Sequence, residues 1–429
     1  MRVLCARVGE RKEAKQMNEE KRDENISSCE VEKGDPKLEK KDLILSLAVV
    51  LLCGCVLSGA IPSAFVGFAS AILFAYTVVA VRNIGAVMQL LFVSIIATVL
   101  TFLPIAGAAV LALMLGTGTL AWLFMTLPKY KWAPACILIF SYGMGFLITS
   151  NPVAPLLAFA ILPAAALMAR AHARDLGRTS TVLHALLGFI LVVLATLCTV
   201  LWRSYGSVNY DSLMRLINGT KDLFVAVGGE AGNLLWESLE STSTQSSLSQ
   251  ESLEQLRESF NQIFSESSLR MIADTVMGLA PALIIAPTLI ISYLSDVVLL
   301  RKYYNTEWRS RMTPAACSLT IGPATGLVYF VCFLVVMFAK EQNVFVMTIY
   351  NMCLILLPGL CLTGVNVILQ NARRTRGWMG MASILLLVAA FCCIGFSSFY
   401  FVALWGAYAT IAAALQQKIM QKMKDRDEK

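Results

Sequence analysis

Charged residues are scarce in this sequence. They make up 15% of the 429 residues, whereas apolar residues make up 57%, and the mean hydropathy is +0.68. This balance excludes an ordinary globular domain in water and predicts that lipid surrounds most of the chain. Because the apolar runs are long and unbroken instead of alternating, they predict membrane-spanning helices and not a β-barrel.

Catalytic and metal-binding motifs are also missing. The two histidines, His172 and His184, have no H-E-x-x-H motif or Cys/His cluster around them, so no zinc site is expected. No G-x-x-x-x-G-K-[ST] loop occurs, and ATP hydrolysis by this chain alone is not expected. Cys53 and Cys55 lie in an apolar run without His or acidic neighbours, where packing is favoured over metal binding. The sequence predicts neither an enzyme nor a bound cofactor.

The apolar segments predict an all-α fold, a polytopic transmembrane bundle of about 12 helices. The predicted helices are approximately Leu43–Ser58, Ala64–Val81, Ile84–Leu103, Ile105–Leu127, Trp132–Ser150, Pro152–Ala169, Thr181–Trp202, Met271–Leu300, Pro314–Ala339, Val344–Gln370, Met379–Ile394 and Ser397–Leu415. Several neighbours are separated only by a Gly, Pro or Ser break, and the combined runs are too long for one crossing, so tight hairpins are predicted.

The charges in the loops predict the orientation. Every predicted inner loop carries Lys or Arg, whereas the short outer connections carry none except Lys340, which Glu341 balances. Cytoplasmic loops hold the excess of basic residues, so both termini are predicted in the cytoplasm and the protein in the cell membrane. Because the net charge of +7 is distributed over these loops, no nucleic-acid partner is expected.

Five regions follow along the chain. They are a disordered cytoplasmic tail (1–42), an N-terminal transmembrane bundle of about seven helices (43–202), an extracytoplasmic amphipathic helical loop (203–270), a C-terminal bundle of about five helices (271–416) and a basic cytoplasmic tail (417–429). The loop holds nine acidic and five basic residues, and its apolar residues follow helical spacing. A helical hairpin packed on its own protein is favoured over a segment lying on the lipid surface.

A few polar residues within the apolar helices are candidates for binding a substrate. They are Asn151, Asp274, Asn351 and Asn366. Such groups hydrogen-bond a solute in a cavity or bridge neighbouring helices, and for any one of them bridging is the favoured interpretation. A further acid, Asp296, lies near the inner end of its predicted helix and is interpreted as an interfacial residue paired with a nearby base such as Arg301.

A stripe of small residues marks the second predicted helix. Gly67, Ala71 and Ala75 recur every four residues and form a smooth face that permits close approach of another helix. The face is predicted to serve helix packing within the protein or contact with a partner, and internal packing is favoured.

The C-terminal half resembles the YybS-like family of uncharacterised bacterial membrane proteins. The resemblance lies in the order of Leu299-Leu300-Arg301-Lys302, then Met312-Thr313-Pro314, then the run from Gly359 to Val367, and a final apolar pair with a basic tail. That family is thought to be distantly similar to the substrate-binding S components of energy-coupling-factor transporters. The resemblance implies capture of a solute from outside and coupling to a separate ATP-driven module through small-residue helix faces.

The sequence therefore predicts a multi-pass membrane protein for solute capture or transport, with the lipid bilayer and an ATP-driven energising module as partners. The alternative is a membrane scaffold that contacts proteins of the cell envelope through its outer loop. An enzyme acting on lipid-linked substrates is disfavoured because no cluster of acids or histidines occurs at a membrane face.

Overall fold

The computed structural model describes nine stretches of the chain. They are residues 40–81, 103–127, 132–150, 154–174, 176–243, 250–304, 321–339, 343–374 and 397–427. Nearly all of them belong to one unit of the chain, Leu45–Lys429. Two predicted helices, Ile84–Leu103 (apart from Leu103) and Met379–Ile394, lie outside the described residues, as does most of the predicted N-terminal tail.

Every regular element in these stretches is helical. The elements are α2 (Lys40–Leu57), α3 (Ser63–Val81), α5 (Pro104–Thr126), α6 (Trp132–Thr149), η1 (Ala154–Ala160), α7 (Ile161–Ala173), α8 (Arg178–Tyr205), α9 (Tyr210–Ser243), α10 (Gln250–Ile263), α11 (Glu266–Gly278), α12 (Ala280–Tyr304), α14 (Pro323–Phe338), α15 (Val344–Arg374) and α17 (Ser398–Asp427). Within the described residues, seven stretches are long and apolar enough to cross a bilayer, and α3 and α14 contain shorter apolar helices. The prediction of an all-α membrane protein is confirmed at this level.

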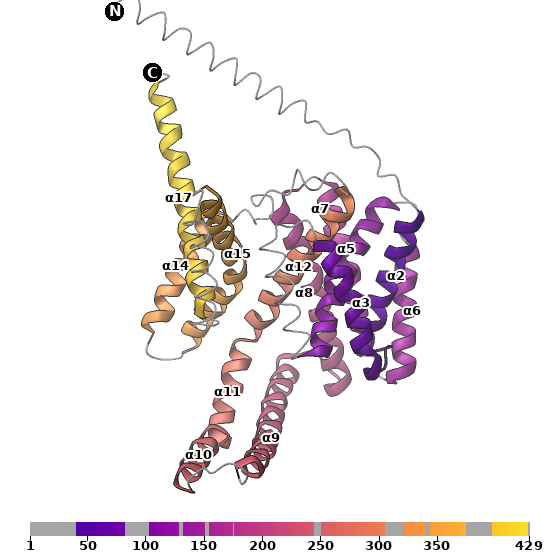
Figure 1. Ribbon diagram of the computed structural model, residues 1–429, viewed down its shortest axis with the longest axis vertical. Helices are drawn as coiled ribbons and strands as arrows, with labels where there is room; N and C mark the ends of the chain where they lie inside the picture. The colour runs from indigo at the N-terminus through magenta and orange to yellow at the C-terminus, as the bar shows by residue number, and fades with distance from the viewer. Residues whose placement is uncertain are drawn as a thin grey trace, which may run out of the picture. The chain divides into compact units, whose positions relative to one another are not determined.

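The helices pack in two groups (Figure 1). In the first group α5 lies against α3, α7 and α12, and α8 lies against α7 and α12. In the second group α14, α15 and α17 contact one another, and a contact between α12 and α15 joins the groups. Thus α12 follows α9, α10 and α11 in the chain, yet it packs against helices that precede them.

Small residues allow this close packing. The sequence of α5 is rich in Ala, Gly and Thr, and most of its residues are buried. In the second group, a Cβ atom added to Gly406 of α17 would collide with backbone atoms of Leu360 and Gly364 in α15. Only glycine permits the two helix backbones to cross at this distance.

One predicted helix, Met271–Leu300, is wrong as a single element. The chain forms two helices there, because α11 ends at Gly278 and α12 begins at Ala280. Pro281 has no backbone N–H, and its ring conflicts with the carbonyl four residues earlier, so the apolar run cannot continue as one regular helix. The opposite difference occurs in α17, which continues to Asp427 instead of ending near Leu415.

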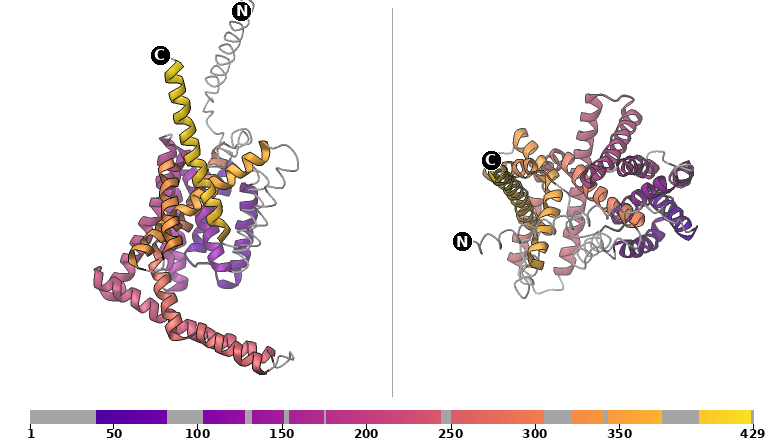
Figure 2. Two further views of the ribbon diagram at one scale, coloured as in Figure 1. Left: turned by 90° about the vertical axis from the view of Figure 1, so that its left-hand side faces the viewer. Right: turned by 90° about the horizontal axis from the view of Figure 1, so that it is seen from above.

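The helices α9, α10 and α11 form a helical hairpin, which is called the outer hairpin here after the extracytoplasmic loop that the sequence predicts. Helices α9 and α11 lie side by side, and α10 contacts both (Figures 1 and 2). Trp236 of α9 packs against Phe260 with ring centroids 5.6 Å apart, and Phe264 stacks on Phe260 at 4.5 Å. The Arg257 guanidinium carbon lies 5.7 Å from the Trp236 ring centroid. These contacts hold the hairpin together on its own residues.

Candidate functional site

A buried ion pair joins α8 to α12. The Nε atom of Arg178 donates a hydrogen bond of 2.8 Å to Oδ2 of Asp296. The Asp296 side chain is 1% exposed and the Arg178 side chain 14% exposed. Arg178 is the first residue of α8, so the carboxylate of Asp296 lies beside the N-terminal end of that helix. The partial positive charge of a helix N-terminus favours an anion in this place.

Aromatic and aliphatic side chains cover the pair. The guanidinium carbon of Arg178 lies 4.9 Å from the centroid of the Tyr293 ring, a distance at which a cation is attracted to the ring face. Tyr293 and Asp296 are three residues apart and therefore share one face of α12. Tyr293 also packs with Val182 of α8 and with Leu362 of α15. The pair thus lies beside the contact between the two helix groups.

Helix α5 closes the other side of α12 at this level. A Cβ atom added to Gly118 would meet the backbone oxygen of Ser295 and the side chain of Val298. The residues on either side of that glycine, Thr117 and Thr119, are 0% exposed, and their hydroxyl oxygens have no hydrogen-bond partner among the described residues. A buried hydroxyl without a partner costs about 1 to 3 kcal/mol. Polar groups therefore gather in an apolar core around this turn of α12.

The pair is expensive to maintain. Two charges in a low-dielectric interior lose a hydration free energy that their mutual attraction barely offsets. Replacing them with an apolar pair of similar volume commonly leaves a protein as stable or more stable. The nearby hydroxyls of Ser292 and Ser295 donate to the carbonyls of Thr288 and Ile291 one turn earlier in their own helix. Charges held at this cost within membrane helices mark a functional site more often than a structural one.

The prediction for Asp296 is corrected by this geometry. The expected partner was a nearby base such as Arg301, and the expected position was interfacial. The partner is instead Arg178, 118 residues earlier in the sequence, and the carboxylate is buried within the protein. The interfacial position stays a prediction, because burial between helices does not give the depth in a membrane. The physical reason is that the start of α8 packs against the last turns of α12, so Arg178 reaches Asp296 from a neighbouring helix.

Asn351 bridges the break between α11 and α12. Its Nδ2 donates to the Gly278 carbonyl at 2.7 Å and to the Met347 carbonyl at 3.0 Å, and its Oδ1 accepts from the Ala282 N–H at 3.2 Å. Broken membrane helices need such side chains to satisfy the freed backbone groups. The bonds to Gly278 and Ala282 bridge α15 to α11 and α12, the favoured interpretation for this residue, whereas the bond to Met347 stays within α15.

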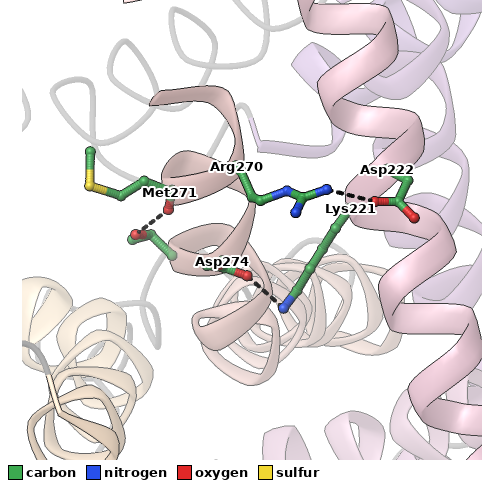
Figure 3. A network of polar contacts seen from close by, with 6 residues as sticks. Lys221, Asp222, Arg270, Met271 and Asp274 are labelled. Atoms are coloured by element: carbon green, nitrogen blue, oxygen red, sulfur yellow. Dashed lines mark hydrogen bonds and ion pairs between the residues drawn. The ribbon is translucent and has the colours of Figure 1, made fainter. Parts of the chain in front are cut away.

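Asp274 lies one turn before the same break, on the surface of the outer hairpin. Its carboxylate accepts a contact of 2.6 Å from Lys221 of α9, and beside it Arg270 pairs with Asp222 at 3.5 Å (Figure 3). The side chain of Asp274 is 58% exposed. The structure therefore brings Asp274 of α11 and Asn351 of α15 near the same break. The side chain of Asp274 pairs with Lys221, whereas that of Asn351 bonds to backbone groups.

The remaining predicted site residues are less defined. Asn151 lies outside the described residues, and so does the side chain of Asn366. Gly67, Ala71 and Ala75 lie on α3, where all three are exposed, and a Cβ atom added to Gly67 would meet nothing within 4 Å. Among the described residues no cluster of three or more His, Cys, Asp or Glu side chains suits a metal ion.

Sequence reasoning missed Arg178 as a site residue. One signal was available, because the predicted topology places the start of Thr181–Trp202 and the end of Met271–Leu300 on the same side of the membrane.

No family model, curated protein or solved structure matches this chain. The resemblance to the YybS-like family stays a prediction.

Proposed function

We propose that this chain is a multi-pass protein of the cell membrane that captures or transports a solute, and that the Arg178–Asp296 pair is its central working element. The single observation that supports the proposal is the burial of this ion pair between α8 and α12. A purely structural bundle would gain stability from an apolar pair in the same place. Retention of the charges fits a role in binding or gating.

The proposed mechanism uses the position of the pair beside the contact of the two helix groups. With the pair closed, Arg178 and Tyr293 hold α8 against α12. When a solute or a partner competes for either charge, that attachment is lost and α8 and α12 are free to move apart at this level. Asn151, Asp274, Asn351 and Asn366 remain proposals for contacts on the outer part of the path.

The topology belongs to the same proposal. About twelve crossings with both termini in the cytoplasm follow from the basic inner loops. Energy would come from an ion gradient or from an ATP-driven partner module, because the chain has no phosphate-binding loop of its own. No catalytic role is proposed.

A second candidate function is a membrane scaffold that contacts envelope proteins. One observation favours it: several large apolar side chains of α9 face outward from the hairpin, including Leu223, Val227 and Leu234, at 55 to 63% exposed. These three residues recur on one side of the helix, opposite the side that carries Lys221 and Trp236. A row of this kind can bind a partner protein outside the membrane.

The test is native mass spectrometry of protein purified gently from its own cells, with identification of every molecule that accompanies it. The transport proposal expects a stoichiometric small molecule or an ATP-binding module with the wild type. The Asp296→Asn variant should lose the small molecule, whereas the Asp222→Asn variant, which alters an exposed ion pair, should keep it. Envelope proteins alone, with no small molecule and no ATP-binding module, would refute transport. Deleting the hairpin would then remove those proteins if the scaffold function holds.

A further inference from the structure

The surroundings of Asp296 have the parts of a binding site for a positively charged group. The carboxylate of Asp296 and the ring of Tyr293 share one face of α12, and the guanidinium of Arg178 lies against both of them. A carboxylate beside the face of an aromatic ring is an arrangement that attracts ammonium and guanidinium groups. The guanidinium of Arg178 therefore occupies the place that such a group on a solute would take.

The two partners of the ion pair differ in their freedom to leave it. Asp296 has a short side chain that is 1% exposed, in the later part of α12. Arg178 has a long, flexible side chain that is 14% exposed, at the first residue of α8. The side chain that contacts the carboxylate thus also reaches the protein surface, so Arg178 is the partner that a competing solute can displace.

The position of Arg178 is not explained by the stability of its own helix. A positive charge at the first residue of a helix faces the positive end of the helix dipole, which is unfavourable. The preceding residue, Gly177, makes no side-chain cap for the helix either. The arginine in this place is better explained by the carboxylate that it contacts.

Charge decides the class of solute. A cation that replaces Arg178 keeps the carboxylate of Asp296 paired, and the released guanidinium is hydrated at the surface. An anion that takes Arg178 would instead remove the partner of a buried carboxylate, and an unpaired buried charge is strongly destabilising. Helices α5, α8 and α15, which pack against α12, contain no Asp or Glu. A cation that enters between these helices therefore pairs with Asp296.

An organic cation fits this place better than a metal ion. The hydroxyls of Ser292 and Ser295 donate to carbonyls of their own helix. In the part of the chain that the structure describes, no cluster of three or more His, Cys, Asp or Glu side chains suits a metal. The ring of Tyr293, in contrast, is a surface on which a guanidinium or ammonium group can lie.

We propose that the site between α8 and α12 binds an organic cation with a guanidinium or primary ammonium group, which pairs with Asp296 after displacing Arg178. This inference rests on the proposed function and names the substrate class of the same site. Arg178 then acts as an internal competitor. Because one cation replaces another, the charge beside Asp296 stays balanced, and α8 loses its attachment to α12 only while the solute is bound.

Thermal unfolding of the full-length protein in detergent tests the proposal, with methylguanidinium as the cation and acetate as the anion at the same ionic strength. A ligand that binds the folded protein raises its unfolding temperature. Millimolar methylguanidinium should raise that temperature for the wild type and for Asp222→Asn, which alters an exposed ion pair, but not for Asp296→Asn. Acetate should raise it for none of the three.

A variant without the internal competitor measures the displacement. In Arg178→Gln the site is open in every molecule, so methylguanidinium should reach half of its effect at a concentration roughly ten-fold or more below that for the wild type. Arg174→Gln, which removes an exposed arginine near the same helix end, should behave like the wild type. If Arg178→Gln fails to fold, the comparison of methylguanidinium with acetate on the wild type still decides the sign of the solute.

Stabilisation of Arg178→Gln alone, with no effect on the wild type, would overturn the proposal, because the probe would then only fill the space that the substitution creates. So would an equal effect on Asp296→Asn, or stabilisation of the wild type by acetate.

Native mass spectrometry of the purified protein separates this failure from that of the proposed function. A co-purified amine or guanidine supports both. A co-purified small molecule without a positive charge would refute the organic cation and leave solute capture standing. Absence of any small molecule and of any ATP-binding module would refute solute capture itself.

Discussion

Asp296→Asn is the sharpest perturbation of the buried pair. The change removes the charge of the carboxylate but preserves its shape, so Arg178 loses its ion pair with Asp296. Breaking a buried ion pair in this way costs about 3 to 5 kcal/mol. The exposed pair of Arg270 and Asp222 supplies the control, because a surface pair contributes only about 0 to 1 kcal/mol.

The native cysteines supply the assay. Cys53 and Cys353 are almost fully buried, so a thiol-reactive fluorescent dye reports unfolding in detergent as temperature rises. The Asp296→Asn variant should unfold several degrees below the wild type, whereas Asp222→Asn should unfold at nearly the wild-type temperature. If the two variants unfold at the same temperature, the reasoning from burial is wrong.

A double variant separates stability from function. Replacing Arg178 by Met and Asp296 by Leu removes both charges and keeps much of the volume, so the unfolding temperature should return to or exceed that of the wild type. Solute retention should still be lost. A double variant that is stable and still carries the wild-type small molecule would show that the pair is only a structural contact, and the proposed function would fail.

Three further predictions concern packing. Gly406→Ala should destabilise the protein by about 1 to 3 kcal/mol in the same dye assay, because the added methyl group meets a helix backbone. The control Gly143→Ala has free space around it and should be neutral or stabilising by up to about 1 kcal/mol; equal losses would contradict the close crossing. Asn351→Ala should cost about 1 to 3 kcal/mol and accelerate amide exchange at residues 278–282, since it leaves backbone groups without partners; unchanged exchange there would refute the bridge. Trp236→Ala should loosen the outer hairpin by about 2 kcal/mol, less than a fully buried Trp would, and proteolysis should increase within residues 210–278 while the unfolding temperature of the bundle stays the same.

The sequence predicted the helices well where a long apolar run ends in polar residues. The observed bounds of α2, α3, α5 and α6 lie within three residues of the predicted ones, because hydropathy and length alone decide a membrane helix. The same signal could not reveal the break at Leu279, since both α11 and α12 are apolar near it. Pro281 was the available clue.

The candidate site was predicted less well, for a different reason. Asn351 and Asp274 were selected because they are polar within or beside apolar helices, and the contacts they make depend on α9, α11 and α15 coming together. The pairing of Arg178 with Asp296 is a tertiary contact across 118 residues, and local periodicity carries no information about it. Only the predicted topology, which places both residues at the cytoplasmic ends of their predicted helices, pointed to it.

Helix α12 connects the break at Leu279 with the ion pair of Asp296. Its first turn is bonded to α15 through the hydrogen bond from the Ala282 N–H to Asn351, and about 21 Å farther along the helix, at 1.5 Å per residue, it carries Asp296. Pro287 interrupts the hydrogen-bond ladder between these points and gives the rod one place to bend. We therefore expect a movement of the outer hairpin to change the position of Asp296 relative to Arg178.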